Sequence, residues 1–268
     1  DMTARSGALI AFERQGLYRG SRVDIAARLD CVIPVMHGLH GEDGTLQGLL
    51  EMMDIPYAST GVAGSSIGMD KIMMKAFFRG MGFPVLPGCA VMRSDWTADR
   101  EAVLDRVEEA LSYPVYVKPA NLGSSIGVAR ADDRAGLADA LDLASAFDRR
   151  ILVERGLEKP VEVNCSVRGF DRQAEASVVE MPISGSGFLD FDKKYLTGGG
   201  GAKGMASLKR VVPAPIGEDM THRVRQLSLD VFKALDCKGV VRVDYMIDPA
   251  TDALFITDPS NQAWLTGY

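Results

Sequence analysis

Short apolar runs alternate along this chain with longer stretches in which apolar residues recur at helical spacing. Runs of strand length lie at residues 30–36 (DCVIPVM), 161–169, 174–181 and 240–248. Helical periodicity is found at residues 45–53, 70–81, 98–111, 135–147 and 220–235. This alternation favours helices layered on sheets, an α/β architecture, over a helix bundle or a β-sandwich.

Composition and charge narrow the class of protein. The chain has 268 residues, 47% of them hydrophobic, which is enough for a large core and several modest domains. A net charge of −6 without a basic block argues against nucleic acid as a partner. No apolar run reaches membrane-spanning length and no signal-peptide pattern is found, so we expect a cytoplasmic protein without a membrane partner. The four cysteines lack CxxC or zinc-site spacing, which indicates free thiols.

Changes of pattern predict the domain organisation. Breaks near residues 66 and 160 divide the chain into domains at 1–66, 67–160 and 161–268. The chain opens at Asp1 without a methionine, and its first clear strand arrives as though part of a domain came before it. We therefore expect a fragment. The Met-rich face of the helix at 70–81 is interpreted as core filling.

One segment has the character of a phosphate site. The stretch YPVYVKPANLGSSIGV places Lys118 at the end of an apolar strand, directly before a loop of glycine and serine. Backbone N–H groups of small residues approach a phosphate closely, and an ammonium group neutralises its charge. The spacing is not that of a P-loop, so a tight turn with one exposed lysine is the alternative interpretation.

Carboxylates near the ends of later strands suggest further parts of one site. Glu154 and Glu162 are placed to accept hydrogen bonds from an adenine amino group and ribose hydroxyls, or else are solvated strand ends. In VVRVDYMID, Asp244 shares a strand face with Arg242 and Met246, and Asp258 follows on the next strand. Two carboxylates on neighbouring strands can hold magnesium together with phosphate oxygens.

Several segments together resemble one family. They are PVMHGLHGEDGTLQGLLEMMDIPY, GMDKIMMKAFFRGMGFPVLP, YPVYVKPANLGSSIGV, ILVERGLEKPVEVN, FLDFDKKYL and VVRVDYMID, spread over roughly residues 30–258. In order and spacing the chain resembles the D-alanine:D-alanine ligases of the ATP-grasp superfamily. The resemblance implies an α/β (α+β ATP-grasp) fold. Its parts are a partial Rossmann-like domain at 1–66, a central lid domain at 67–160 and a C-terminal catalytic domain at 161–268, with ATP between the last two.

The resemblance also implies a role for each matching residue. The residues implied to bind ATP are Lys71, Lys118, Glu154, Arg155, Leu157, Glu162, Lys194 and Met246. Those implied to surround the amino-acid substrate are His37, Glu42, Ser124, Tyr195 and Arg242. The implied ligands of Mg²⁺, or of Mn²⁺ as the alternative ion, are Asp244 and Asp258.

The implied reaction makes D-alanyl-D-alanine for peptidoglycan synthesis. ATP phosphorylates one D-alanine carboxylate to an acyl phosphate, and the amine of a second D-alanine attacks it. Closure of the loop at 197–207 would exclude water, and Tyr195 favours an amine nucleophile. The family is commonly dimeric, so a homodimer is expected. The alternatives are a D-alanine:D-serine type ligase, a ligase for another carboxylate and amine, and a catalytically impaired ATP-binding homologue or fragment.

Departures from the family pattern lie towards both ends of the chain. The family's opening strand, with its glycine-rich turn and glutamate, has no counterpart in residues 1–29. The carboxylate-x-Asn of the metal site reads Asp258-Pro259-Ser260, and the Pro-Gly that should follow is replaced by Ala263-Trp264. These departures motivate the impaired alternative.

Overall fold

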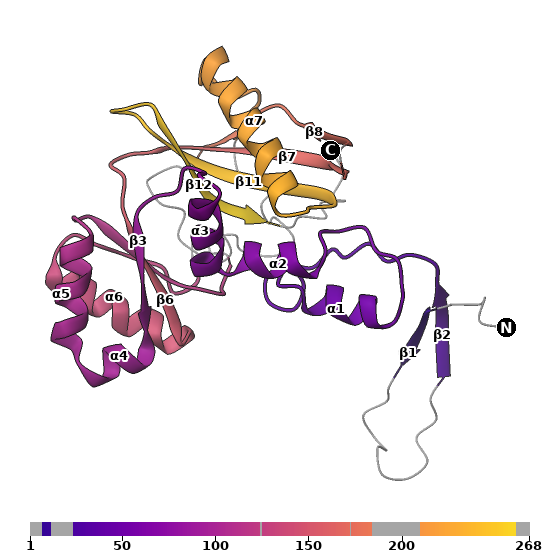
Figure 1. The fold of residues 1–268 in the computed structure, drawn as a ribbon, viewed down its shortest axis with the longest axis horizontal. Helices are drawn as coiled ribbons and strands as arrows, with labels where there is room; N and C mark the ends of the chain where they lie inside the picture. Colours follow the sequence, from indigo (N-terminus) through magenta and orange to yellow (C-terminus); the bar gives the residue numbers. More distant parts are fainter. Residues whose placement is uncertain (1–6, 12–23, 124, 172, 184–209, 261–268) are drawn as a thin grey trace, which may run out of the picture.

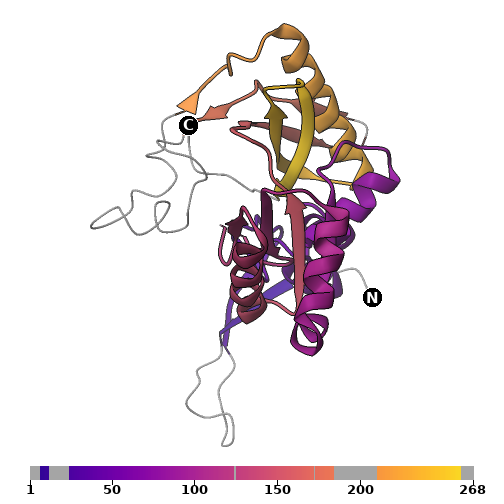
Figure 2. The ribbon, with the colours of Figure 1, turned by 90° about the vertical axis from the view of Figure 1, so that its left-hand side faces the viewer.

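The computed structural model describes residues 7–11, 24–123, 125–171, 173–183 and 210–260. Along the chain, a hairpin with short helices is followed by a four-stranded sheet with its own helices and by a second four-stranded sheet with one long helix (Figures 1 and 2). This packing of helices on sheets confirms the predicted α/β class. Within the described ranges no helix is long and apolar enough to cross a membrane.

The N-terminal part contains a hairpin of β1 (Gly7–Ala11) and β2 (Asp24–Leu29), followed by α1 (Thr45–Met52) and α2 (Val62–Met69). The prediction of a strand at residues 30–36 is wrong. Val32 alone makes a strand-like bridge there, to Tyr57, while Ile33, Val35 and Met36 are about half exposed. An apolar run needs a continuous ladder of hydrogen bonds on at least one side to form a strand.

Helix α1 confirms the helix predicted at residues 45–53, but its buried face differs. Leu50 is buried as expected, whereas Met53 is exposed and Gln47 takes a buried position. Helix α2 was not predicted, because its sequence VAGSSIGM lacks apolar periodicity. Its small residues permit close packing: a Cβ added to Gly64 would lie 2.3 Å from the carbonyl oxygen of Leu235.

The central sheet is antiparallel, with strand order β3-β6-β4-β5. Its strands are β3 (Gly88–Met92), β4 (Val115–Pro119), β5 (Ala129–Ala131) and β6 (Arg150–Arg155). One face shares a hydrophobic core with α4 (Arg93–Ala98), α5 (Arg100–Ala110) and α6 (Arg134–Phe147). Helices α5 and α6 confirm the predictions at 98–111 and 135–147. Helix α4 is additional, and Asp99 separates it from α5 by capping Ala102 N–H at 3.0 Å.

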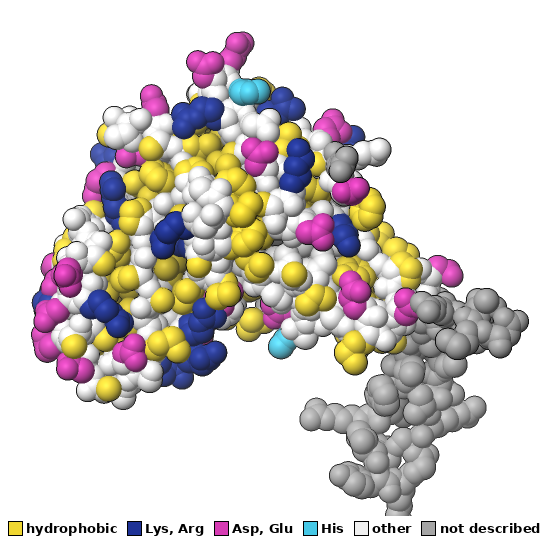
Figure 3. Space-filling model, in the orientation of Figure 1, with side chains coloured by type: hydrophobic (Ala, Val, Ile, Leu, Met, Phe, Trp, Pro, Cys, Tyr) yellow, Lys and Arg dark blue, Asp and Glu magenta, His cyan; other side chains and the backbone are white. Residues whose placement is uncertain are grey.

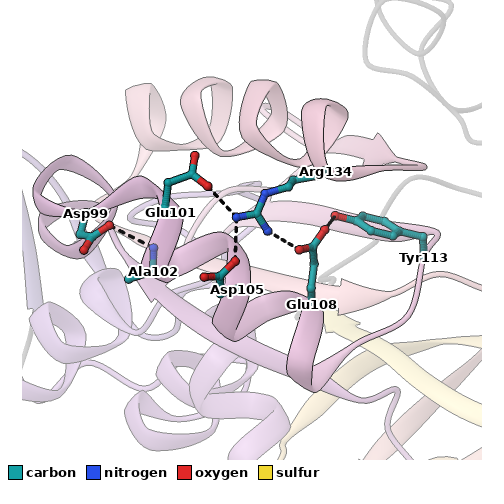
Figure 4. A network of polar contacts seen from close by, with 7 residues as sticks. All are labelled: Asp99, Glu101, Ala102, Asp105, Glu108, Tyr113 and Arg134. Atoms are coloured by element: carbon teal, nitrogen blue, oxygen red, sulfur yellow. Dashed lines mark hydrogen bonds and ion pairs between the residues drawn. The ribbon is translucent and has the colours of Figure 1, made fainter.

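An ion-pair cluster holds α5 against α6 (Figure 4). Arg134, the first residue of α6, lies 2.7 Å from Glu101 and 2.7 Å from Asp105, and it also pairs with Glu108. The hydroxyl of Tyr113 donates to Glu108 at 2.8 Å. Hydrogen bonds to Glu101 and Asp105 raise the pKa of Arg134 further above its ordinary value. A single cation thus links three carboxylates on consecutive turns of α5 to the start of α6.

The C-terminal sheet has strand order β12-β11-β7-β8. Its strands are β7 (Val161–Phe170), β8 (Gln173–Ala176), β11 (Gly239–Asp248) and β12 (Ala253–Ser260). Helix α7 (Glu218–Ala234) lies on one face (Figures 1 and 2), where Ser228 and Tyr245 share a buried hydrogen bond of 2.7 Å. The strand predicted at 174–181 is split between β8 and β9 (Met181–Pro182), which pairs with β10 (Arg210–Val211).

Helix α3 (Lys71–Gly80) lies between the two sheets and confirms the helix predicted at 70–81 (Figure 1). The Asp70 carboxylate caps its first turn, accepting backbone N–H groups at 3.0 and 3.1 Å. Gly82, at φ +76, follows its end. Met74 and Phe78 are fully buried in the core of the C-terminal sheet, whereas Met73 and Met81 are about half exposed, so the core-filling interpretation of the Met-rich face holds for Met74 and is wrong for the other two. The division of the chain into domains at 66 and 160 stays a prediction.

Candidate active site

Glu154 on β6 is the most buried carboxylate of the predicted site, with 1% of its surface exposed. Its Oε2 accepts a hydrogen bond of 2.5 Å from Nζ of Lys118, and its Oε1 forms an ion pair with Lys75 of α3. Burial raises the pKa of Glu154, but Lys118 and Lys75 together lower it below its ordinary value. The carboxylate is therefore ionised and held between two ammonium groups.

Strand alternation explains why these groups meet. On β6, Ile151 and Val153 face the helices of the central sheet, which leaves Glu154 on the opposite face. On β4, Lys118 also lies on that opposite face, and the register pairs Tyr116 with Glu154. Lys118 is then the diagonal neighbour of Glu154, within reach of a long side chain. Helix α3 brings Lys75 from outside the sheet.

The loop after β4 is fastened to the start of α3. Lys71 donates from Nζ to the carbonyl oxygen of Leu122 at 2.5 Å, and from its backbone N–H to Ala120 at 3.0 Å. Gly127, at φ +70, is folded so tightly that an added Cβ would lie 2.7 Å from Phe147. Lys71, at the start of α3, thus contacts the loop that directly follows Lys118 on β4.

A hollow of about 390 Å³ adjoins this loop. Its lining comes from the turn before α1 and the start of α1, from α2, from the start of α3 and from the loop, and consists of Asp43, Thr45, Ser66, Ile67, Asp70, Met73 and Asn121. Glu42, one of the predicted substrate residues, lies in the same turn and accepts the N–H of Gly38 at 2.5 Å. His37 is exposed beside it. A second hollow, of about 420 Å³ near the end of α7, contains none of the predicted site residues.

The open face of the C-terminal sheet carries the second group of predicted residues. The register of β11 and β7 places Met246 opposite Glu162. Two residues from Met246 along β11, Asp244 accepts hydrogen bonds from Arg242, 2.7 Å from Nε and 2.8 Å from Nη2. All four of these residues are half-buried and alternate with the core residues that face α7. The prediction that Arg242, Asp244 and Met246 share a strand face is confirmed.

The two predicted metal ligands, Asp244 and Asp258, are neighbours in the backbone of the sheet. Asp258 on β12 is the register partner of Asp244, which places their Cα atoms across one strand pair. The side chain of Asp258 lies outside the described part of the structure. Among the residues that are described, no three His, Cys, Asp or Glu side chains come together as a metal site. A pair of carboxylates nevertheless suits Mg²⁺, which completes its coordination with phosphate and water.

The segment after β6 is the predicted adenine edge. The N–H of Arg155 donates to the carbonyl of Pro87 at 2.9 Å, and the N–H of Gly156 donates to Pro114 at 2.7 Å. The Arg155 carbonyl, rather than its N–H, is therefore the group to consider for adenine. Leu157, two residues after Arg155, is buried.

Several residues of the predicted site lie outside the described part of the structure. They are Ser124, Lys194, Tyr195, the loop at 197–207, Ala263 and Trp264. Conversely, sequence reasoning missed Lys75 and the lining residues of the 390 Å³ hollow. A signal for Lys75 existed, because it is a charged residue among the apolar positions of IMMKAFF, four residues after Lys71.

Comparison with known proteins agrees with these motifs. Models of the D-ala D-ala ligase C-terminus and N-terminus match residues 77–259 and 11–60. The chain is 39% identical over 243 residues to a D-alanine–D-alanine ligase of Acetivibrio thermocellus, covering 91% of this chain and 62% of that relative. It is 40% identical over 230 residues to a D-alanine–D-alanine ligase of Thermoanaerobacter sp., covering 86% and 61%.

Solved structures show the same relationship. The VanG D-Ala:D-Ser ligase from Enterococcus faecalis matches with a TM-score of 0.76 and 28% identity, covering 94% of this chain and 70% of that one. The D-alanine-D-alanine ligase from Coxiella burnetii matches with a TM-score of 0.66 and 26% identity, covering 87% and 59%. The chain spans about 62% of the length of the first curated relative. Because a family model matches more than half of it, the chain belongs to the D-alanine–D-alanine ligase family.

Proposed function

We propose that the protein containing this chain is an ATP-dependent ligase that joins two D-alanine molecules into D-alanyl-D-alanine for peptidoglycan synthesis. The observation that carries the proposal is the buried Lys118–Glu154 pair beside the loop fastened by Lys71. It combines a carboxylate that can accept an amino group with cations that can hold phosphates. The relatives named D-alanine–D-alanine ligase support the choice of reaction.

In this proposal ATP lies between the central and C-terminal sheets. Glu154 accepts the adenine amino group, the carbonyl of Arg155 and the N–H of Leu157 meet the purine edge, and Met246 packs on the ring. Glu162, opposite Met246 across the strand pair, takes the ribose hydroxyls. The phosphates are held by Lys71, Lys118 and Lys194.

Mg²⁺ or Mn²⁺ would be held by Asp244 and Asp258. When bound, the ion would neutralise phosphate charge and orient the phosphoryl group for transfer. Both carboxylate oxygens of Asp244 accept hydrogen bonds from Arg242 in this structure. Metal binding therefore requires Asp244 either to share an oxygen between Arg242 and the ion or to release Arg242. Arg242 would then be free to stabilise the oxyanion that develops on the acyl carbon.

The reaction in this proposal has two transfers. The terminal phosphoryl group of ATP passes to a D-alanine carboxylate oxygen, and ADP leaves. The amine of the second D-alanine then attacks the acyl carbon, phosphate leaves, and the amine loses a proton as the amide forms. His37, Glu42, Ser124 and Tyr195 would position the amino acids, and the loop at 197–207 would exclude water.

A D-alanine:D-serine ligase is the second candidate, favoured by the likeness to VanG over 94% of the chain. On the face shown in Figure 3, Lys and Arg side chains lie among acidic and apolar ones. We further propose a cytoplasmic protein that forms a homodimer.

The test is phosphate release from ATP with Mg²⁺, with and without D-alanine and D-serine, together with mass detection of the product. Release that depends on D-alanine and yields D-alanyl-D-alanine supports the proposal, whereas D-alanyl-D-serine supports the second candidate. Asp244→Asn should abolish this turnover. ATP binding without phosphate release or product would leave a nucleotide-binding homologue and overturn the ligase.

A further inference from the structure

Two lysines share one buried carboxylate beside the proposed purine site. The side chain of Glu154 is 2% exposed, that of Lys75 is 4% exposed and that of Lys118 is 14% exposed. Lys75 contacts Oε1 and Lys118 contacts Oε2, so each carboxylate oxygen has its own ammonium group. Lys75 has no assigned role in the proposed reaction.

Among the side chains that the structure describes, the charges of this cluster do not balance without a further anion. Two ammonium groups face one carboxylate, and Lys118 is the more exposed of the two. The polyphosphate of a nucleotide is the group that would draw Lys118 away from Glu154. Glu154 would then remain buried with Lys75 as its contacting cation. A buried carboxylate without a cation takes up a proton, and a protonated carboxyl is a weaker acceptor for an amino group.

The geometry points to Lys75 as a positioning residue that keeps Glu154 ionised and oriented while Lys118 binds phosphate, so that the site selects purines with a 6-amino group. This inference rests on the proposed nucleotide site and assigns the residue that maintains its selectivity. Lys75 acts through Glu154 and does not itself touch the nucleotide. Its ammonium is fixed by α3, which is anchored at Asp70 and buried at Met74 and Phe78.

In the described part of the chain, few groups around Glu154 could replace Lys75. From β4, Tyr116 is the register partner of Glu154, and Lys118 is the second contacting cation. From β3, the register partner is Gly88, which brings no side chain. Burial lowers the pKa of Lys75, and Arg79, one turn further along α3, lowers it slightly more. We therefore infer that Lys75 and Lys118 keep Glu154 ionised.

The test compares two nucleotides that differ in one group. Binding of ATP and of purine riboside triphosphate, which lacks the 6-amino group, is measured by calorimetry for the unchanged chain and for Lys75→Met. We expect the unchanged chain to prefer ATP equally from about pH 6 to about pH 9. In Lys75→Met that preference should fall about tenfold or more at the low end and recover as the pH rises. The sign follows because losing a cation raises the pKa of Glu154, so its ionised form is lost as the pH falls.

Matched variants separate charge from packing. In a Glu154→Gln background, which removes the titration, Lys75→Met should leave the nucleotide preference unchanged. Lys233→Met, at an exposed lysine on α7, should behave like the unchanged chain. Lys75→Gln carries the same expectation as Lys75→Met should the latter fail to fold. Thermal unfolding of each variant shows which of them are folded.

The outcomes distinguish the inference from the proposal beneath it. If the unchanged chain does not bind ATP, the proposed nucleotide site itself fails. If it prefers ATP and Lys75→Met keeps that preference at every pH, the role of Lys75 is overturned. An equal loss for both nucleotides, persisting in the Glu154→Gln background, would also overturn it, because Lys75 would then serve only packing.

Discussion

Arg242 donates two hydrogen bonds to Asp244, 2.7 Å from Nε and 2.8 Å from Nη2. The two residues are separated by one position on β11, so strand alternation places them on the same face. The proposed roles need them apart, because Asp244 would bind a divalent ion and Arg242 would stabilise the reacting acyl group. The pair therefore competes with the metal for one carboxylate.

This competition gives a prediction for Arg242→Gln. Turnover should fall by about 10²- to 10³-fold, the usual effect of losing an oxyanion donor. The Mg²⁺ concentration for half-maximal activity should stay the same or fall, because Asp244 is released from its partner. Asp244→Asn, by contrast, should show no turnover at any Mg²⁺ concentration. Steady-state rates measured over a Mg²⁺ titration test this prediction. A higher Mg²⁺ concentration for half-maximal activity in Arg242→Gln would contradict the competition between Arg242 and Mg²⁺ for Asp244.

Gly127 should not tolerate a side chain. It lies at φ +70, and an added Cβ would meet Phe147 at 2.7 Å and Pro119 at 2.9 Å. We expect Gly127→Ala to lower the free energy of unfolding by about 1–3 kcal/mol and to weaken ATP binding by displacing the loop. Gly123→Ala in the same loop is the matched control, because an added Cβ there meets nothing within 4 Å. Chemical denaturation and ATP titration of both variants measure the effect. Similar behaviour of the two would refute this account of the loop.

Replacing Glu154 by an apolar residue should be costly to stability. Glu154→Leu leaves Lys75 and Lys118 close together in a buried place, and breaking such a pair costs about 3–5 kcal/mol. Adding Lys75→Met should recover part of the loss, since one unpaired charge is then removed. Denaturant unfolding of the two single variants and the double variant gives the coupling. Strict additivity would show that the ion pair is not formed.

The same cluster predicts a pH dependence of stability. Lys118 and Lys75 depress the pKa of Glu154 below its ordinary value of 4.5. A depressed pKa contributes stability that is fully present above 4.5 and is lost as the pH falls through the folded-state value. Acid unfolding of the unchanged chain should therefore include this contribution, and Glu154→Gln should lack it. A steeper loss of stability in acid for Glu154→Gln would contradict the assignment.

Arg134 should stabilise the helices of the central sheet in a salt-dependent way. It joins Glu101, Asp105 and Glu108 of α5 to the start of α6. We expect Arg134→Met to lower the melting temperature at low salt and to have a smaller effect at high salt, because exposed charges are screened. Arg168→Met, which removes an exposed ion pair with Glu175 on the C-terminal sheet, should change the melting temperature less. Calorimetry at two salt concentrations measures both.

Local pattern was sufficient for much of the fold. Periodicity located α3, α6 and α7, and strand alternation placed Arg242, Asp244 and Met246 on one face. It failed at residues 30–36, which are apolar but have almost no ladder partner, and at α2, whose small residues have no periodicity. In both cases the deciding contacts come from other segments of the chain.

By itself, the sequence determined the α/β class, the family motifs and the side chains that share a strand or helix face. These depend on spacings of two to four residues, which backbone geometry alone converts into position. The tertiary structure decided which faces meet. Lys75 became part of the site because α3 packs beside β6, and Asp244 became the register partner of Asp258 because β11 pairs with β12. Such neighbours are set by the burial of distant apolar surfaces and by strand pairing, which no local spacing encodes.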